Sequence, residues 1–510
     1  MNWNDEIVLL RVPLPEDVLK HKWHGDFAAA QRVIDRRLSR DIPEVMQKRL
    51  LLEKKLLMRI PEYYIYTREE ACTILKETIR DFQPQELDAL LDEDYVDWFY
   101  INGELRIRDN FLENLLKTRP DYEARQIHEG SADGDVAANG RSCEAQRTRD
   151  DRSADVNVAT DEGKGESLSK AAFLQKTCSL MRREGGIRHT IRLRARLWLR
   201  DDAGVQPGET VRAYLPVPAV DAQVKRVQIL DDGTAAIPEG CLRFVHIAEE
   251  HAPQRTICWE VNWQPGIEFA VEYEYEIAAG YIDLWGASVN VPALETWKTQ
   301  YACFDPVMPD DLAEQEPHII FSPLICSLTA EVVGEETRPL EKARRIYNYI
   351  TTKAHYSFMR SYATIPSISE YIAAGQKGDC GVQALLFITM CRQAGIPARW
   401  QSGLYAQPGD VGCHDWARFY IEEYGWLFAD CSFGGSGYRH GDESKRRFYF
   451  GNLDPWRMPS CRRFQTNFDP PMEKLRSDPY DAQSGEVELP DKELHDRHPF
   501  ESETVMISCV

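Results

Sequence analysis

The feature that most constrains the fold is a polar segment without aromatic residues that divides the chain between Tyr122 and Phe173. Before this segment, apolar residues recur every three or four positions among many Leu, Glu, Lys and Arg, which is typical of amphipathic helices. After it, the apolar period changes to two, the period of half-buried strands. A chain of 510 residues is also too long for one core. The sequence therefore predicts several domains.

We expect residues 1–126 to form a helical N-terminal region and residues 127–172 to form a disordered linker. The stretch from His128 to Ser167 is polar, charged and rich in Gly, Ala, Ser and Asp. Such a stretch buries too little apolar area to offset the backbone entropy lost on folding, about 1–2 kcal/mol per residue.

A β-sandwich domain is predicted over residues 173–295, with antiparallel strands between about 187 and 280. The run HTIRLRARLWLR, residues 189–200, places apolar side chains on one face and arginines on the other. Further β-rich runs follow, separated by the turn signals DDGT, PEG and QPG. A solvated sheet face explains the arginines more simply than a stripe that binds nucleic acid.

Residues 331–470 combine helical and strand patterns and are predicted to form a mixed α/β core. Beyond residue 470 prolines alternate with acidic residues and periodicity is weak. We therefore expect residues 471–510 to form an acidic tail that lies over the surface or is mobile. The predicted fold class is α+β and multidomain, with a helical N-terminal region, an antiparallel β-sandwich and a C-terminal α+β core.

The most informative motif is GDCGVQALLF, which begins at Gly378. Asp379 is a good helix N-cap, and apolar residues at helical spacing follow it. Cys380 is therefore expected on the first turn of a helix, where free N–H groups and the helix dipole favour a thiolate and can receive an oxyanion. A single cysteine in this position is more often a small packed hydrophobic residue. The catalytic interpretation therefore needs partners.

Those partners lie in the run GCHDWARFYIEEYGWLFAD, residues 412–430, which is typical of two strands joined by a tight turn. His414 opens the first strand and Asp430 closes the second, so the hairpin brings their side chains to neighbouring positions, in a register that depends on the turn. A thiol needs an imidazole to take its proton, and the imidazole needs an acceptor on its other nitrogen. Singly, a surface histidine and a capping aspartate are simpler interpretations, but together the residues predict a triad of Cys380, His414 and Asp430.

Residues 331–470 resemble the transglutaminase-like superfamily. The motifs that carry the resemblance are GDCGVQALLF, CRQAGIPARWQSG, HDWARFYI and GWLFAD, in this order. The resemblance implies a papain-like core in which Cys380, His414 and Asp430 form the catalytic triad. Members of the family include cross-linking transglutaminases, thiol proteases, peptide N-glycanases and inactive scaffolds, so the resemblance implies chemistry rather than a substrate.

The sequence departs from this family in two places. Animal transglutaminases have a Trp before the Cys that helps to hold the oxyanion, but no Trp occurs here between Trp297 and Trp400. Tyr356, Tyr362 and Gln376 are the alternatives, and we prefer Tyr356 as the oxyanion candidate. The triad aspartate is followed by Cys-Ser, where relatives commonly have Pro and then Ser or Thr.

Composition and missing motifs limit the partners. The chain has 61 Lys and Arg against 82 Asp and Glu, a net charge of −21, which disfavours nucleic acid. No apolar run is long enough to span a bilayer, so no membrane partner is expected. The N-terminus lacks the layout of a secretory signal and the 13 cysteines lack paired spacing, so we expect a cytoplasmic protein. The sequence has no nucleotide-binding or zincin motif, so no cofactor is expected. Cys413-His414 lacks a second pair of ligands at zinc spacing, and no acidic calcium-binding loop is present, so no metal is expected either.

The sequence thus predicts a cysteine-dependent acyl-transfer enzyme that attacks peptide or glutamine carboxamide carbonyls of a protein or peptide substrate through a thioester. With water as acceptor it would be a thiol protease or amidase, a hydrolase; with an amine it would be a transglutaminase. The alternative is a catalytically inactive scaffold of the same fold that binds a protein or glycan partner. The presence of all three triad residues favours the enzyme.

Overall fold

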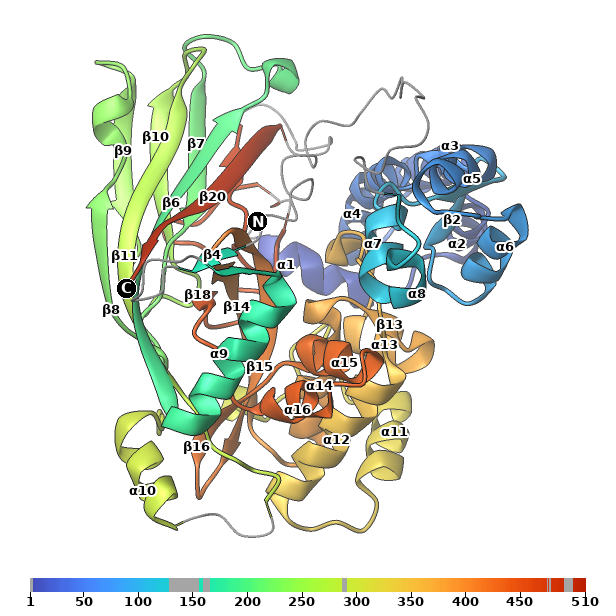
Figure 1. Cartoon of the computed structure of the whole chain (residues 1–510). Coiled ribbons are helices and arrows are strands. Elements are labelled where there is room, and N and C mark those ends of the chain that lie inside the picture. The colour runs from blue at the N-terminus through green and yellow to red at the C-terminus, as the bar shows by residue number, and fades with distance from the viewer. Residues whose placement is uncertain are drawn as a thin grey trace.

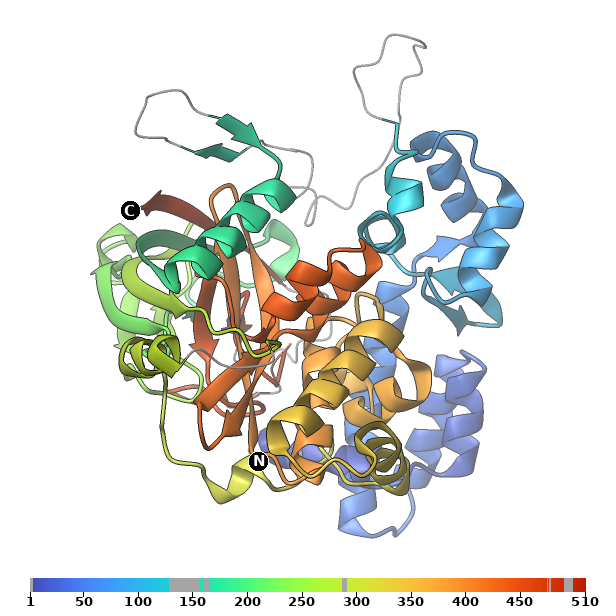
Figure 2. The ribbon, with the colours of Figure 1, turned by 60° about the horizontal axis from the view of Figure 1, so that its bottom comes forward.

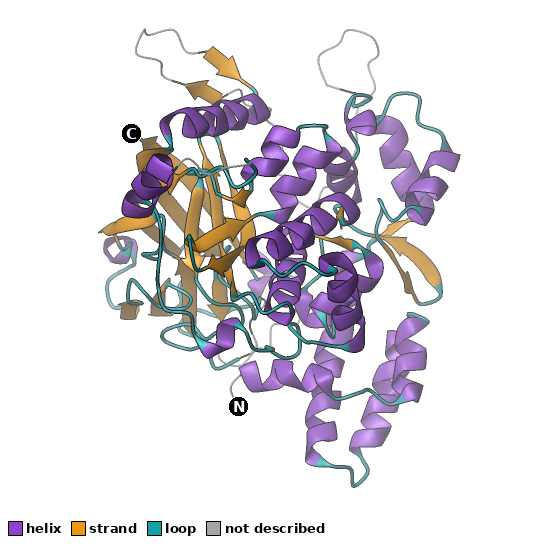
Figure 3. Ribbon diagram, turned by 90° about the horizontal axis from the view of Figure 1, so that it is seen from below, coloured by secondary structure: helices purple, strands orange, loops and turns teal. Residues whose placement is uncertain are grey.

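The computed structural model describes residues 3–127, 156–158, 166–286, 291–474, 476, 478–489 and 499–510. Figure 1 shows the N-terminal helices in blue, the β-sandwich in green with a red strand, and the C-terminal core in yellow and orange. Most strands gather on one side of the molecule and most helices on the other (Figure 3). The structure confirms the predicted multidomain α+β fold class.

Amphipathic helices dominate the N-terminal region, as their apolar period predicts, and two buried apolar clusters hold them together. They are α1 (Trp3–Val8), α2 (Glu16–Trp23), α3 (Phe27–Leu38), α4 (Glu44–Tyr63), α5 (Arg68–Thr78), α6 (Pro84–Asp92), α7 (Phe111–Thr118) and α8 (Pro120–Glu123). Local signals set their ends. At α5, for example, Thr67 and Glu70 form a capping box.

A small sheet that the sequence analysis did not predict lies among these helices. Its strand order is β1-β3-β2, and its strands are β1 (Tyr66–Thr67), β2 (Trp98–Ile101) and β3 (Glu104–Ile107). The turn between β2 and β3 is Asn102-Gly103, and both residues have positive φ. Asn-Gly is a strong signal for a two-residue hairpin turn, so this hairpin was readable from the sequence.

Part of the segment predicted as a disordered linker forms regular secondary structure. Strands β4 (Val156–Val158) and β5 (Glu166–Leu168) pair antiparallel, and Ser169 caps helix α9 (Lys170–Glu184). The other linker residues, 128–155 and 159–165, lie outside the described residues.

Two four-stranded antiparallel sheets form the predicted β-sandwich. One has the order β19-β7-β10-β9 and the other β20-β6-β11-β8. The strands are β6 (Gly186–Leu199), β7 (Thr210–Pro216), β8 (Val224–Asp231), β9 (Leu242–Ile247), β10 (Thr256–Asn262), β11 (Glu268–Gly280), β19 (Glu486–Glu488) and β20 (Phe500–Cys509). The inner face of β6 is fully buried at Ile191, Leu193, Ala195 and Leu197. The apolar period of two therefore predicted the buried face correctly.

The arginines on the outer face of β6 pair with glutamates of the neighbouring strands. Arg192 forms an ion pair with Glu272 of β11, and Arg196 forms ion pairs with Glu268 of β11 and Glu503 of β20. Cross-strand pairs of opposite charge stabilise a solvated sheet face. This pairing accounts for the arginine stripe without a polyanion.

The C-terminal segment, predicted as a surface or mobile tail, contributes a strand to each sheet of the sandwich. β19 pairs with β7, and β20 pairs with β6 over nearly its whole length. The prediction of a tail was wrong here because β19 is only three residues long and β20 joins a sheet edge whose partner lies about 300 residues earlier. Pairing over such a distance leaves no local signal.

The C-terminal core consists of a five-stranded antiparallel sheet of order β17-β16-β15-β14-β18 and helices packed against it. Its strands are β14 (Ala398–Gln407), β15 (Asp410–Ile421), β16 (Gly425–Ala429), β17 (Phe450–Gly451) and β18 (Arg457–Cys461). Its helices are α11 (Pro323–Val333), α12 (Pro339–Lys353), α13 (Ile368–Gly375), α14 (Cys380–Gln393), α15 (Cys431–Arg439) and α16 (Glu443–Phe448). The short strands β12 (His355–Tyr356) and β13 (Lys377–Gly378) pair in parallel before α14. Helix α10 (Val291–Gln300) precedes the core.

The core lies between the sandwich and the N-terminal helices (Figure 2). One apolar cluster runs from the sandwich into the core, and a buried ion pair joins Arg418 Nη1 to Asp221 Oδ1 at 2.8 Å across that boundary. On the other side, Arg108 of the N-terminal region donates hydrogen bonds to the carbonyls of Phe358 and Met359. Both neighbours therefore hold the core in place.

The search for membrane-spanning helices covered only the described residues, and none of their helices is long and apolar enough to cross a bilayer.

Candidate active site

Cys380 begins helix α14, as the sequence predicts. Asp379 is the N-cap, and its Oδ1 accepts a hydrogen bond from the Val382 N–H at 3.1 Å. The Tyr362 hydroxyl donates to the same oxygen at 2.5 Å. A Cβ at Gly381 would collide with the Tyr362 hydroxyl and with Asp415, so only glycine fits beside the cysteine. The start of α14 is thus fixed by its cap and by close packing.

His414 and Asp430 lie together on the predicted hairpin. His414 Nε2 is 2.8 Å from Asp430 Oδ2, and both side chains are buried. The strand β15 begins four residues before His414, so the histidine lies within it rather than opening it, and Asp430 follows the end of β16. The register pairs Ala417 with Ala429, which brings His414 and Asp430 to the same side. Only the structure could supply this register.

Arg457 of β18 completes a buried charge network that the sequence analysis missed. Its Nη2 lies 3.0 Å from Asp430 Oδ2 and 3.0 Å from Asp454 Oδ2, and its side chain is fully buried. Burial acts to raise the pKa of Asp430, but the charges of His414 and Arg457 outweigh it and lower that pKa to about 2. Asp430 is therefore ionised at neutral pH and accepts the His414 Nε2 proton.

Burial lowers the pKa of His414, although Asp430 opposes the shift. The imidazole is accordingly neutral at neutral pH. With Nε2 directed at Asp430, the free Nδ1 is the nitrogen that can accept a proton. This is the tautomer that a general base requires.

The Cys380 thiol is hydrogen-bonded to a residue that the sequence analysis did not select. Its Sγ lies 3.3 Å from Asp415 Oδ2, and within the described residues no hydrogen bond joins it to His414. Burial, followed by the charges of Asp415 and Asp379, raises the pKa of Cys380 well above its usual value. A helix N-terminus contributes only about 0.3–1 kcal/mol at an exposed site, so the predicted thiolate is not favoured at rest.

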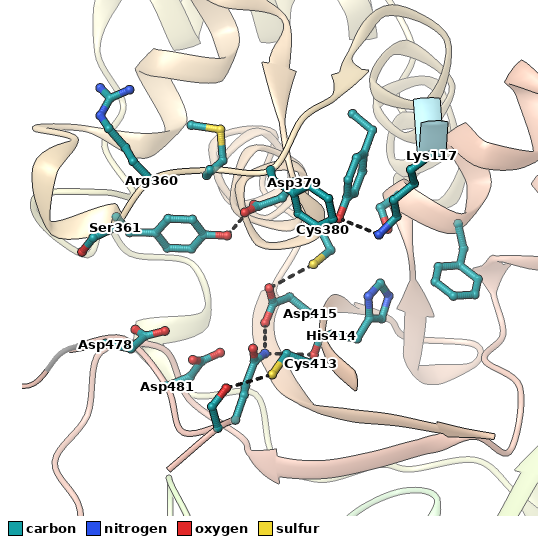
Figure 4. Close-up of a pocket in the computed structure, with 18 of the residues that line it drawn as sticks. Lys117, Arg360, Ser361, Asp379, Cys380, Cys413, His414, Asp415, Asp478 and Asp481 are labelled. Atoms are coloured by element: carbon teal, nitrogen blue, oxygen red, sulfur yellow. Dashed lines mark hydrogen bonds between the residues drawn. The ribbon is translucent and has the colours of Figure 1, made fainter. Parts of the chain in front are cut away.

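Cys380, His414 and Asp415 line a single cavity of about 510 Å³ (Figure 4). The remaining walls come from four regions: Tyr63 and Lys117 of the N-terminal region, the segment before α13 that includes Tyr356 and Tyr362, helices α15 and α16, and the segment around β19 that includes Asp478 and Asp481. A cavity of this size is typical of small-molecule and peptide sites. The site is thus assembled from all parts of the chain.

The C-terminal segment that was predicted as a tail contributes Asp478 and Asp481 to the wall of this cavity, close to Asp415. Burial, followed by Asp379, raises the pKa of Asp415 to about 7, and burial also raises the pKa values of Asp478 and Asp481. Gln483 donates hydrogen bonds to the His414 carbonyl at 3.1 Å and to the Asp415 carboxyl group. No sequence signal marked these residues, because their position depends on how β19 pairs.

Of the oxyanion candidates, Tyr356 and Tyr362 line the cavity and Gln376 does not. The Tyr356 hydroxyl accepts a hydrogen bond from Lys117 Nζ at 3.3 Å, and burial raises its pKa well above the usual value. Tyr362 is committed to Asp379. Gln376 instead donates to the Tyr349 hydroxyl at 3.1 Å.

The search for metal sites covered the described residues alone, where no group of three or more His, Cys, Asp or Glu could hold a metal ion. The cysteines that the structure describes are free thiols.

Residues 327–431 match the family model of the transglutaminase-like superfamily. A curated relative, the uncharacterized protein YebA of Bacillus subtilis, is 22% identical over 139 residues, and the match covers 24% of this chain and 18% of the relative. The chain therefore corresponds to less than a fifth of that protein.

Two solved structures share fold elements at low identity. A proposed cysteine protease from Cytophaga hutchinsonii has 14% identity and a TM-score of 0.33, with 64% of this chain and 89% of that chain covered. The periplasmic domain of TgpA from Pseudomonas aeruginosa has 15% identity and a TM-score of 0.25, with 51% and 92% covered. The family match spans α14 and the His414–Asp430 hairpin, so the C-terminal core of this chain is a domain of the transglutaminase-like superfamily.

Proposed function

We propose that the chain is a cysteine-dependent acyl-transfer enzyme that acts on peptide or glutamine carboxamide carbonyls of a protein or peptide substrate. The single observation that carries this proposal is the buried chain from Arg457 through Asp430 to His414, which ends in the cavity lined by Cys380. In this chain Asp430 orients the imidazole and favours its protonated form, although burial and Arg457 act against protonation.

In the proposed reaction, the Cys380 thiol rotates from Asp415 towards His414 and transfers its proton to Nδ1 as sulfur attacks the substrate carbonyl carbon. Catalytic hydrogen bonds are often loose before substrate binds, so the resting contact with Asp415 is compatible with this step. The backbone N–H of Cys380 and the Tyr356 hydroxyl are the proposed donors to the oxyanion.

The carbon–nitrogen bond then breaks, the imidazolium returns its proton to the leaving amine or ammonia, and a thioester remains on Cys380. Water or a second amine attacks the thioester while His414 again takes the proton. The carbon–sulfur bond then breaks, the acid or amide product leaves, and the imidazolium returns the proton to the Cys380 sulfur. Hydrolysis defines a protease or amidase, and attack by an amine defines a transglutaminase. The cavity as described favours neither acceptor.

We also propose a reducing, cytoplasmic location, because a nucleophilic thiol must stay reduced and the described cysteines are unpaired.

The test combines two assays with the variants Cys380→Ala, His414→Ala and Asp410→Asn, the last a control on the same strand outside the triad. Release of products from a peptide library and incorporation of an amine into a glutamine-containing protein are measured in parallel. We expect one assay to report turnover that both alanine variants reduce by about a thousandfold or more. The inactive scaffold is the correct interpretation if neither assay distinguishes the parent from Cys380→Ala.

A further inference from the structure

Three cations line one end of the catalytic cavity: Lys117 of α7, Arg439 of α15 and Lys445 of α16. We call them the cation cluster. Within the described part of the chain, none of them forms an ion pair with a carboxylate, although the net charge of the chain is −21. Buried arginines elsewhere do form ion pairs: Arg399, for example, lies 2.8 Å from Asp311.

Two members of the cluster stand over aromatic rings beside the reacting groups. Lys117 Nζ lies 4.7 Å from the centroid of Tyr356 and 4.6 Å from that of Phe358. Lys445 Nζ lies 5.3 Å from the centroid of Phe433, whose ring is 4.8 Å from the imidazole of His414. The charges therefore lie next to the groups proposed to react.

Arg439 is the member with an unsatisfied donor. Its Nε is buried and has no hydrogen-bond partner among the residues that the structure describes. Burial lowers the pKa values of both Arg439 and Lys445, and for Lys445 the nearby charges of Asp430 and Asp442 offset that shift only in part. A buried donor without a partner costs about 1–3 kcal/mol, and planar guanidinium groups match carboxylates well. An incoming carboxylate would relieve this cost.

Away from the cation cluster the cavity is lined by Asp478 and Asp481 and by Arg360, which donates a hydrogen bond to the Thr364 hydroxyl. Figure 4 shows Cys380 between Lys117 and the two aspartates Asp478 and Asp481. A carboxylate is therefore attracted to the end of the cavity that carries the cation cluster. This polarity gives a bound substrate a direction relative to the thiol.

On the basis of the proposed acyl transfer, we propose that the cation cluster binds a carboxylate of the substrate next to the carbonyl that Cys380 attacks. The substrate class is a peptide with a carboxylate at this position, supplied by its C-terminus or by an acidic side chain. The cluster thus determines specificity and takes no part in proton transfer.

Alkylation of Cys380 tests the charge preference without requiring turnover. Iodoacetate carries a carboxylate and iodoacetamide does not, so the ratio of their rates at Cys380, divided by the same ratio for free cysteine, measures attraction of the anion. We expect this normalised ratio to exceed one in the parent. In Lys117→Gln and in Arg439→Gln it should fall about three- to tenfold, because each variant removes one positive charge a few ångströms from the bound anion. Lys117→Arg should retain it.

The control is Lys48→Gln, which removes one positive charge from α4 in the same N-terminal region; Lys48 pairs there with Glu44 and does not line the cavity. Its normalised ratio should equal that of the parent. A parent ratio of one, or a ratio unchanged in both cluster variants, overturns the proposal while leaving the proposed acyl transfer intact.

Calorimetry with Cys380→Ser measures binding independently of the thiol and distinguishes the two sources of carboxylate. One peptide has a free C-terminus, a second has an amidated C-terminus and a glutamate side chain, and a third is amidated with glutamine in place of that glutamate. We expect one of the first two to bind at least about tenfold more tightly than the third, and Lys117→Gln to remove the difference. Equal affinity for all three overturns the proposal, whereas preferential binding without turnover in the parent contradicts only the proposed function.

Discussion

The two sides of the catalytic cavity differ in how their charges are balanced. On the imidazole side, Asp430 and Asp454 share Arg457, and His414 lies against Asp430. On the thiol side, Asp379 and Asp415 surround Cys380, and neither forms an ion pair in the part of the chain that the structure describes. The first side is prepared to hold a positive charge on the imidazole, while the second keeps the thiol protonated. The resting site is thus a neutral thiol beside a neutral, oriented imidazole and not a thiolate–imidazolium pair.

The largest expected effect comes from removing Arg457, the cation on the imidazole side of the cavity. Arg457→Met removes the cation that two buried carboxylates share, so we expect the free energy of unfolding to fall by about 3–5 kcal/mol in urea titrations. Arg457→Lys, which retains the charge, should lose less. The control Arg338→Met removes an exposed arginine paired with Glu336 and should stay within about 0.5 kcal/mol of the parent. A loss below about 1 kcal/mol for Arg457→Met would show that Arg457 does not compensate the buried charges of Asp430 and Asp454.

The next largest effect concerns the orientation of His414 by Asp430, on the same side of the cavity, rather than the stability of the fold. Asp430→Asn keeps the shape of the side chain but removes the charge that fixes the His414 tautomer, so we expect kcat to fall about a hundredfold or more in the assay that reports turnover. The control Asp26→Asn changes the N-cap of α3, which lies outside the cavity, and should leave kcat unchanged.

Acid stability adds a second measurement on Asp430. Because its pKa in the folded protein is about 2, below the value of 3.8 expected without the fold, its ionised form stabilises the protein above about pH 4. That contribution is lost as the pH falls towards 2. The slope of unfolding free energy against pH in this window should be smaller in Asp430→Asn than in the parent.

A smaller effect of opposite sign is expected on the thiol side. Asp415→Asn removes a negative charge next to Cys380 Sγ, so the pKa of the thiol should fall and alkylation by iodoacetamide at pH 7.5 should become about tenfold faster. Asparagine keeps one acceptor oxygen, which can take the hydrogen bond of the thiol or that of Gln483 but not both. Glu422→Gln, a charge change at the exposed turn of the same hairpin, serves as the control. Slower or unchanged alkylation in Asp415→Asn would mean that Asp415 does not hold the thiol protonated.

The same variant has a consequence for stability. The pKa of Asp415 is raised to about 7, so the folded state binds a proton that the unfolded state releases above about pH 4. Stability therefore decreases from about pH 4 to 7 in the parent through this group. We expect a flatter dependence in Asp415→Asn when unfolding is followed across that range.

The smallest effect concerns the C-terminal wall. Gln483→Ala removes the hydrogen bonds to the His414 carbonyl and to Asp415, and we expect kcat/KM to fall about two- to threefold, the scale of one modest hydrogen bond. Gln47→Ala, which removes an amide hydrogen bond to the Ile42 carbonyl in the N-terminal region, is the matched control. Equal losses of kcat/KM in the two variants would show that the hydrogen bonds from the C-terminal wall have no special role in catalysis.

Much of the fold followed from local patterns. The periods of helix and strand predicted the N-terminal helices and the inner face of β6, and Asp379 predicted the start of α14. The small sheet around Asn102-Gly103 was missed although its turn signal was present. The pairing of β20 with β6 left no signal, because β-pairing across most of the chain depends on the finished sandwich.

For the site, the sequence by itself determined which residue types stand at the start of α14 and on the hairpin, since capping, period and turn signals act over a few residues. Only the tertiary structure decided that Arg457 holds Asp430, that Asp415 holds the thiol, and that Lys117 and Asp481 line the same cavity. Charges distant in sequence interact through space with strengths set by burial and distance, and the order of residues specifies neither.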